Sequence, residues 1–531
     1  MDITKKNFYE QLENITNDLN KCSFVGFDAE FTAIPSKDAF KHRLFDTNEE
    51  RYNRMKTEVS KMIMSQVGLT MFRYERDLDI YITTVYTFHL CAQVFGDINQ
   101  SFIFQASTLQ FLCRHNFDFN KFIYEGLPFL SKAEEASIRQ QLKDDTLIQN
   151  LTNSLEMAEE KLLQQYCSQV SKWLSMNKDE TLYLDVTCPV LRYLVHNEIR
   201  TRFPNILTTD SLGNSNKILL YRNKSVEGAR SLPKSTLEEK LINNMRGFSQ
   251  IISLLEASKK PIIAHNMFLD TILLHNQFIG PLPSKYSVFK KNINTMFPNI
   301  YDTKYISNEM SKKLTYDEVW KSNALQDLYE FFSEAKCKKL QNCFTYIKVD
   351  EALKMKQSYH EAGWDSYCSG YCFIRLGQWM ASENRGKSRP VGPTETVSAL
   401  APFANKVNVI RGAVPYMNLV NNDPPSHRPE WLHVKALTER TINVGQMASI
   451  LASFGSIDVK PCGSQTALIA ANSSHTADRI LKRFKGSKEY KISRYSAYRN
   501  STGSKMAIWS GALLTGSIML YILHKKVKLL M

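Results

Sequence analysis

The stretch of sequence that decides the fold is SFVGFDAEF, residues 23–31. It is an apolar run that ends in two carboxylates one residue apart. Because alternate residues of a β-strand point to the same face, Asp28 and Glu30 are predicted to project together from the end of a buried strand. Like charges held together repel, and burial strengthens the repulsion. Taken alone, the pattern fits a site for Mg²⁺ or Mn²⁺ and, equally, a strand end that turns into solvent.

Two distant segments supply further candidate ligands. Residues 261–266 (PIIAHN) are predicted to form a short strand, and the helical pattern that follows places Asp270 in its first turn. Further on, His360 and Asp365 lie five residues apart, and they converge if Gly363 helps the chain turn into a helix between them. Four carboxylates and one histidine therefore come from three separated segments.

This order of residues resembles that of the DEDD 3′-to-5′ exonucleases, in the subclass with a histidine base. The resemblance implies that Asp28, Glu30, Asp270 and Asp365 share two Mg²⁺ ions, with Mn²⁺ as the alternative. It also implies that His360 takes the proton from the attacking water and that 5′-nucleoside monophosphates are released. For His360 considered alone, the alternative is an exposed or hydrogen-bonded histidine without a catalytic role.

The similarity extends from about the first residues to near position 380, where matching segments resemble the poly(A)-specific ribonucleases. These segments are 24–34, 46–52, 66–69, 116–121, 265–270, 281–283, 297–298, 302–304 and 360–365. The resemblance implies an α/β, RNase H-like core with a mixed sheet flanked by helices. It also implies that Lys304 contacts RNA and that Phe31 and Ile34 lie near the terminal nucleotides. The alternatives are a surface charge for Lys304 and ordinary core packing for the other two.

The composition agrees with a large basic protein of several domains. The chain has 531 residues and a net charge of +14, which favours a polyanionic partner but does not choose RNA over an acidic membrane. The ten cysteines are scattered, and Cys368 and Cys372, four apart, are predicted to be helix-packing residues. Residues 1–21 do not have the pattern of a secretory signal, so reduced thiols on a cytosolic face are expected.

The predicted organisation divides the chain into six parts. The exonuclease core is expected in two halves, residues 1–150 and 236–385, separated by an inserted small α/β domain, residues 151–235. A linker (386–400), a C-terminal domain (401–500) and a tail (506–523) follow. In the insert, Arg192 and His196 lie four apart on one helix face. Related ribonucleases carry a single-strand-binding domain with an Arg-x-x-x-His motif here, which implies RNA contact. The alternative is a solvated face on a degenerate domain.

The segment 401–500 has a predicted β-α-β-β-α-β order that resembles the RNA-recognition-motif fold, an α+β arrangement. Its third predicted strand, 465–470, lacks the aromatic residues that stack bases in such domains. A docking or dimerising module is therefore favoured over a base-reading one, and a homodimer is possible.

Residues 506–523 carry no charge and just reach the ~18 residues needed to span a bilayer as a helix. Basic residues flank the stretch, and Trp509 and Tyr521 lie near its ends, as interface anchors do. The sequence predicts a single C-terminal transmembrane tail anchor with the enzyme facing the cytosol. The mitochondrial outer membrane is expected, with the endoplasmic reticulum as the alternative location and a buried core helix as the alternative structure.

Together these features predict a membrane-tethered 3′-to-5′ exoribonuclease that shortens single-stranded RNA with free 3′ hydroxyls. The tail makes the chain resemble the branch of the family that trims piRNA precursors. That branch implies PIWI proteins and a mitochondrial Tudor-domain scaffold as partners. The alternatives are a membrane-bound poly(A) deadenylase and a catalytically idle RNA-binding scaffold.

Overall fold

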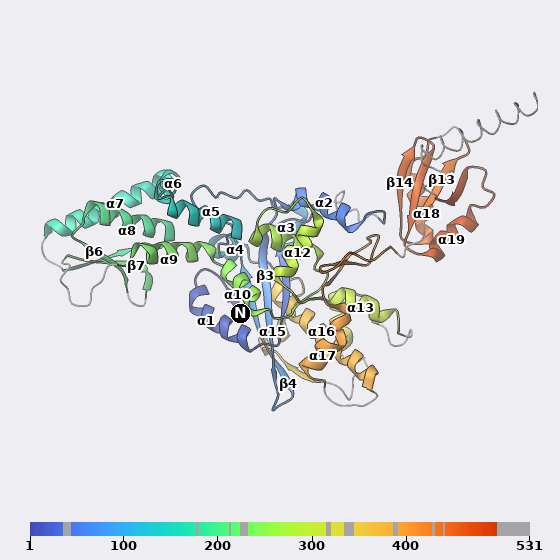
Figure 1. Cartoon of the computed structure of the whole chain (residues 1–531), viewed down its shortest axis with the longest axis horizontal. Coiled ribbons are helices and arrows are strands. Elements are labelled where there is room, and N and C mark those ends of the chain that lie inside the picture. The colour runs from blue at the N-terminus through green and yellow to red at the C-terminus, as the bar shows by residue number, and fades with distance from the viewer. Residues whose placement is uncertain are drawn as a thin grey trace, which may run out of the picture. The chain divides into compact units, whose positions relative to one another are not determined.

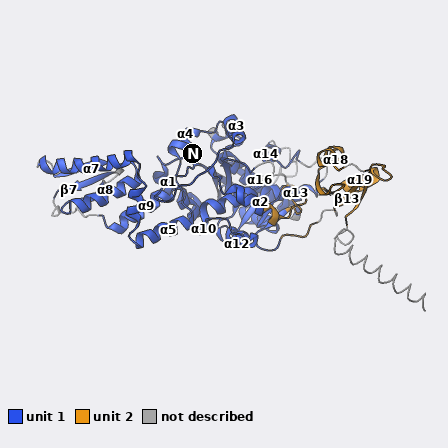
Figure 2. Ribbon diagram, turned by 90° about the horizontal axis from the view of Figure 1, so that it is seen from above, with its two compact units in different colours: residues 1–39, 52–409, 416–422 blue, residues 40–51, 410–415, 423–531 orange. Residues whose placement is uncertain are grey.

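The computed structural model describes residues 1–35, 44–176, 180–211, 214–222, 232–314, 320–333, 345–385, 391–426, 431–438 and 441–495. The chain forms two compact units (Figure 2). The first unit comprises residues 1–39, 52–409 and 416–422, and the second comprises residues 40–51, 410–415 and 423–531. A division into six parts is not tested by these units and stays a prediction.

A mixed sheet forms the centre of the first unit (Figure 1). Its order is β1-β4-β3-β2-β8-β9, and β10 also pairs with β4. The pairs β2–β3 and β3–β4 are antiparallel, whereas β8 runs parallel to both β2 and β9. The predicted mixed sheet is confirmed. The strands are β1 (Asp2–Ile3), β2 (Phe24–Phe31), β3 (Met64–Glu75), β4 (Ile80–His89), β8 (Ile262–Ala264), β9 (Ile300–Asp302) and β10 (Tyr346–Lys348).

Helix α16 (Ala362–Arg385) packs directly on β2 and β3. The approach is so close that a Cβ atom at Gly68 would lie 1.8 Å from the carbonyl oxygen of Ala362. A Cβ atom at Gly26 would likewise lie 2.2 Å from the carbonyl oxygen of Ser366. Cys368 and Cys372 are buried in this helix, which confirms their predicted packing role. Two glycines in the sheet therefore let the first turn of α16 reach the strand that carries Asp28.

Further helices flank this sheet, and one of them forms within the predicted linker. Residues 393–400 were predicted to be linker, but they form α17, which packs against α16 and buries Leu400. Pro393, a residue typical of linkers, also suits the first turn of a helix. The helices are α1 (Phe8–Lys21), α2 (Asn48–Val59), α3 (Ala106–Arg114), α4 (Phe119–Glu125), α10 (Ser249–Ser258), α11 (Phe268–Leu274), α12 (Tyr286–Met296), α13 (Thr303–Ser311), α14 (Leu325–Ser333), α15 (Glu351–Lys356) and α17 (Pro393–Leu400).

The insert builds its own antiparallel sheet, in the order β5-β7-β6, with helices packed around it. Its hydrophobic cluster also takes in Leu147 and Leu241, which lie beyond the predicted limits of residues 151–235. The insert therefore has a hydrophobic cluster that extends beyond residues 151–235. Its elements are α5 (Lys132–Lys143), α6 (Leu147–Asn153), α7 (Met157–Met176), β5 (Thr181–Asp185), α8 (Pro189–Arg202), β6 (Leu207–Ser211), β7 (Asn214–Tyr221) and α9 (Lys234–Arg246).

The second unit contains the predicted β-α-β-β-α-β order, with an antiparallel sheet in the order β14-β15-β13-β16. Residues 401–409 and 416–422, which lie within the predicted C-terminal segment 401–500, belong to the first unit. There the backbone N–H of Asn408, in the hairpin of β11 (Lys406–Asn408) and β12 (Tyr416–Asn418), donates to Asp302 at 2.9 Å. The other elements are β13 (Leu432–Ala436), α18 (Val444–Leu451), β14 (Ile457–Gly463), β15 (Thr466–Ala471), α19 (Ser474–Arg483) and β16 (Tyr490–Arg494).

The predicted tail anchor, residues 506–523, lies outside the described ranges, and so does the first part of the predicted linker, 386–390. Within the described ranges, no helix combines the length and the apolar character that crossing a membrane requires. The tail anchor therefore stays a prediction.

Candidate active site

Strand β2 and helix α16 bring three of the predicted metal ligands together. One carboxylate oxygen from each of Asp28, Glu30 and Asp365 lies within 4.8 Å of the others. Asp28 and Glu30 share a face of β2, as alternation requires, and Asp365 comes from the first turn of α16. Oδ1 of Asp365 is buried and has no hydrogen-bond partner among the described residues. A hard divalent cation fits this oxygen-only donor set.

Asp270, the fourth predicted ligand, lies in the first turn of α11 and is buried. Burial raises the pKa of its carboxyl group to about 7. Asp270 in turn contributes to the raised pKa of both Asp28 and Glu30, so its carboxylate interacts electrostatically with the cluster. The structure therefore places all four carboxylates in one neighbourhood, with three of them in direct proximity.

Burial is the main cause of the raised pKa values in the cluster, and repulsion between the carboxylates adds to it. The pKa of Asp28 is raised by burial and then by the charges of Asp365, Glu30 and Asp270. Burial and the charges of Asp365 and Asp270 likewise raise the pKa of Glu30, and burial raises the pKa of Asp365 to about 7. A cation between these groups would favour their charged forms, because it replaces repulsion by attraction.

Asp302 at the end of β9 holds the segment before Asp270 in place. Its carboxylate accepts the backbone N–H groups of Asn266 and Met267 at 2.9 and 3.0 Å, and it also caps α13. This positioning residue was not recognised from the sequence. The available signal was its location at the end of a short apolar strand, as for Asp28.

His360 contacts the cluster through its backbone, and the residue is exposed to solvent. Its backbone N–H donates to Oδ2 of Asp365 at 3.0 Å, and its φ of 67° is unusual for a residue other than glycine. The centroids of the Phe111 and His115 rings lie 4.9 and 4.3 Å from that of the His360 ring. Partial burial and the neighbouring His115 lower the pKa of His360. The imidazole is therefore neutral near pH 7 and able to accept a proton.

A polar pocket of about 170 Å³ opens next to this histidine. It is lined by His115, Asn116 and Lys121, with Gln66 and His89 from the sheet. The side-chain carbonyl of Gln66 accepts the backbone N–H of Ala362 at 2.9 Å. His360 and residues of the sheet therefore line one pocket. The ring contacts of Phe111 and His115 with His360 were not predicted from the sequence, because they join distant segments.

The predicted RNA contacts in the core come from β2, the residues that follow it, and α13. Phe31 follows Glu30 directly in β2, and Ile34 is 47% exposed a few residues on. Lys304 is the second residue of α13, which Asp302 caps, and burial lowers the pKa of its ammonium group. These positions are compatible with contacts to the end of an RNA, and the roles stay predictions.

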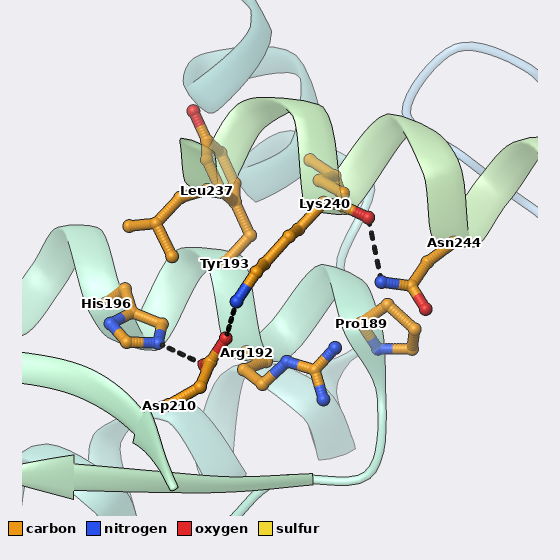
Figure 3. Close-up of a pocket in the computed structure, with 9 residues that line it drawn as sticks. Pro189, Arg192, Tyr193, His196, Asp210, Leu237, Lys240 and Asn244 are labelled. Carbon is orange, nitrogen blue, oxygen red and sulfur yellow. Dashed lines mark hydrogen bonds and ion pairs between the residues drawn. The ribbon is translucent and has the colours of Figure 1, made fainter. Parts of the chain in front are cut away.

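Figure 3 shows Arg192 and His196, the predicted RNA-contact pair of the insert, among the residues that line a pocket of this domain. His196 has 0% exposure, and its Nε2 lies 3.3 Å from Oδ1 of Asp210. The other oxygen of Asp210 accepts from Nζ of Lys240 at 2.5 Å, which ties α8 and β6 to α9. Burial lowers the pKa of His196. His196 therefore acts inside the domain and has no exposed surface for RNA, whereas Arg192 lines the small pocket beside it.

Removal of metal is expected to make stability depend on pH through Asp270. Its pKa of about 7 lies above the ordinary value near 4, so the folded state binds the proton more tightly than the unfolded state. The resulting stabilisation is present below about pH 4 and is lost as the pH rises through about 7.

With chelator present, we expect Asp270→Asn to unfold at least about 2 °C higher than the wild type at pH 8 but not at pH 4. Differential scanning fluorimetry checks this, with Asp77→Asn, an exposed turn carboxylate, as the control. Equal unfolding temperatures of Asp270→Asn and the wild type at pH 8 would contradict the prediction.

Comparison with known proteins agrees with this geometry. Residues 3–373 match the CAF1 family of ribonucleases, so the chain belongs to that family. The predicted DEDD-type core and the 3′-to-5′ exoribonuclease activity are confirmed in this way. Among its relatives is the pre-piRNA 3′-exonuclease trimmer of Bombyx mori, 59% identical over 528 residues, with 99% of both chains covered.

More distant relatives agree with the resemblance seen in the motifs. The poly(A)-specific ribonuclease PNLDC1 of Mus musculus is 27% identical, covering 94% of this chain and 95% of its own length. The poly(A)-specific ribonuclease PARN of Homo sapiens is 26% identical, covering 94% of this chain and 80% of its own. Among solved structures, Pop2p of S. pombe in its Mg²⁺- and Mn²⁺-bound form aligns with a TM-score of 0.33 at 13% identity, covering 71% of this chain and 90% of its own.

Proposed function

We propose that this chain trims the 3′ ends of piRNA precursors by two-metal hydrolysis of phosphodiester bonds. The observation that carries the proposal is the convergence of Asp28, Glu30 and Asp365 within 4.8 Å, beside His360. The choice of substrate is supported by the relative from Bombyx mori, which is named for pre-piRNA and is similar over nearly the whole chain.

Each group in the site has a definite task in this reaction. Asp28, Glu30 and Asp365 would hold Mg²⁺ (or Mn²⁺), with Asp270 completing the set. When bound, two such ions stabilise the attacking and leaving oxygens of an in-line displacement. The neutral imidazole of His360, which lines the polar pocket, would accept the proton of the attacking water. Phe31, Ile34 and Lys304 would contact the end of the RNA, and Arg192 is a peripheral candidate contact.

Trimming and deadenylation are distinguished by the substrate. A membrane-bound poly(A) deadenylase is the second candidate, because relatives at 26–27% identity are named poly(A)-specific ribonucleases. Full-length protein should be incubated with a 5′-labelled mixed-sequence precursor bound to a PIWI protein and, in parallel, with labelled poly(A). We expect stepwise shortening of the precursor, at a higher rate than for poly(A). Shortening of poly(A) alone would favour the second candidate.

We expect an RNA with a 2′-O-methyl group on its last ribose to be a poor substrate. The methyl group adds bulk and removes a hydrogen-bond donor beside the carboxylates, and a site built around a hydroxyl penalises that loss strongly. Initial rates on matched methylated and unmethylated RNAs should differ by at least about 10²-fold. Equal rates for the two ends would contradict a site that holds the terminal hydroxyls.

We expect residues 506–531 to carry the membrane attachment, with the enzyme facing the cytosol at the mitochondrial outer membrane. The support is the uncharged stretch 506–523, long enough for one span. Deleting residues 506–531 should move the protein to the soluble fraction and leave hydrolysis of a free oligonucleotide unchanged, since every proposed metal ligand precedes residue 370. Trimming of PIWI-bound precursor, on a scaffold such as a Tudor-domain protein, should fall as the local concentration falls. A truncated protein that still pellets with membranes after a carbonate wash would rule this tail out as the anchor.

A further inference from the structure

Part of one face of the C-terminal sheet, here called the open face, is covered by a segment of the same chain. Leu44 and Phe45, only 2% and 8% exposed, pack with Leu468 and Ala470 of β15, and Tyr495 adjoins this cluster. All of these residues belong to the second unit, although Leu44 and Phe45 are remote in sequence from the others. Apolar side chains on the sheet surface are thereby removed from water.

The alternation of β15 identifies which face is covered. Ala467, Ile469 and Ala471 pack into the cluster that holds Met447 of α18 and Ile480 of α19. Leu468 and Ala470 therefore point to the opposite face of the sheet, away from α18 and α19. In RNA-recognition-motif folds the sheet stacks bases on its aromatic residues. The segment with Leu44 and Phe45 thus occupies the place where RNA would bind.

The aromatic rings at the edge of this cluster are already in contact with each other. The ring of Phe45 meets Trp431 edge-on, with centroids 5.2 Å apart at 71°. Trp431 and Tyr495 lie with their centroids 5.8 Å apart. A base could stack on the side of the Trp431 ring that contacts Phe45 only if it displaced Phe45.

Polar contacts hold the covering segment at several points. The backbone N–H of Leu44 donates to the carboxylate of Asp458, which also pairs with Arg411 at 2.8 Å. Further along, the backbone N–H of Ala413 donates to the carbonyl of Asp46 at 2.9 Å. The side-chain amide of Asn48 donates to Asp423 at 2.7 Å. The segment is therefore fixed by both main-chain and side-chain bonds, as well as by its apolar contacts.

We propose that the open face of this sheet is a docking surface for residues 44–51 of the same chain and does not bind RNA. The docked segment continues the stretch that leaves β2 after Asp28 and Glu30, so the C-terminal domain binds a piece of the exonuclease sequence. This assigns the domain a partner within the protein, in addition to the proposed trimming activity, and does not depend on which RNA is trimmed.

Lysines on the same face of the sheet make RNA the alternative ligand of this surface, because RNA is a polyanion. Lys435 and Lys491 are register partners on β13 and β16. Their neighbours Val434 and Ile492 face the helices, so both lysines point to the open face. Two adjacent cations could attract phosphates. The experiment must therefore report both where the segment lies and where RNA binds.

Hydrogen exchange of the full chain in detergent tests the docking. We expect Phe45→Ser to increase the rate of amide hydrogen exchange in residues 44–51 by about 10- to 100-fold, because it removes a buried aromatic side chain. Ile450→Ser, at a side chain 41% exposed on α18, is the control and should leave this exchange unchanged. Unchanged protection of β3 and α19 shows that both units remain folded. If Phe45→Ser unfolds the domain, Asp458→Asn replaces it, since this partly exposed carboxylate can be changed without opening the core.

Crosslinking then tests the RNA alternative. Wild-type protein with a 4-thiouridine oligoribonucleotide, with EDTA present to prevent hydrolysis, should give crosslinks in the first unit and none in residues 431–436 or 466–471. The proposal is overturned if the wild type crosslinks at these strands. It is also overturned if exchange of residues 44–51 is the same in the wild type, Phe45→Ser and Asp458→Asn.

Discussion

Replacing Asp28 by asparagine, or Glu30 by glutamine, is expected to reduce hydrolysis of a single-stranded RNA by at least about 10³-fold, since the charge stabilisation supplied by a metal site is several kcal/mol. Each change removes one negative ligand from a cluster whose oxygens lie within 4.8 Å of one another. The fold should survive, because burial and the neighbouring carboxylates already raise the pKa of both groups and disfavour their charged forms. Single-turnover rates with a labelled oligonucleotide measure the effect.

Asp77→Asn is the matched control for these variants, since it removes an exposed carboxylate from the turn between β3 and β4. It should keep the wild-type rate. Titration calorimetry with Mg²⁺ separates metal loss from misfolding, because a folded variant should show weaker metal binding and an unchanged circular dichroism spectrum. Wild-type rates in either ligand variant would refute the two-metal mechanism.

His360→Ala is expected to slow the chemical step by about 10²- to 10⁴-fold, the usual contribution of a positioned general base. The lowered pKa of His360, caused by partial burial and by His115, keeps the ring neutral in the physiological range. In the wild type, the rate should rise with pH through this pKa, because only the neutral imidazole accepts a proton. The alanine variant should lose that limb of the pH profile while still binding RNA.

His475→Ala is the control for this prediction, because His475 is an exposed histidine of the C-terminal domain. Its rate and pH profile should equal those of the wild type. RNA affinity, measured by fluorescence anisotropy with EDTA present, should be the same in both histidine variants. A His360→Ala enzyme with an unchanged single-turnover rate would leave this residue with a purely structural role.

Local geometry explains why much of this protein could be predicted from its sequence. Asp28 and Glu30 were placed on one face because the alternation of a strand requires no knowledge of the rest of the fold. The β-α-β-β-α-β order of the C-terminal domain followed from periodicity and turn residues. The roles of Asp270, His360 and Asp365 came from family resemblance, since their spacing in sequence does not show that they meet.

Tertiary structure alone decided which of these side chains meet and which are accessible. The sequence determined the β2 carboxylates, the strand pattern and the basic character of the chain, all of which depend on neighbouring residues. It did not determine the approach of α16 over Gly68, the burial of His196 against Asp210, or the docking of Phe45 beside Trp431. Each of these contacts joins segments far apart in the chain. Their free energy comes from packing and desolvation, which exist only after the chain has folded.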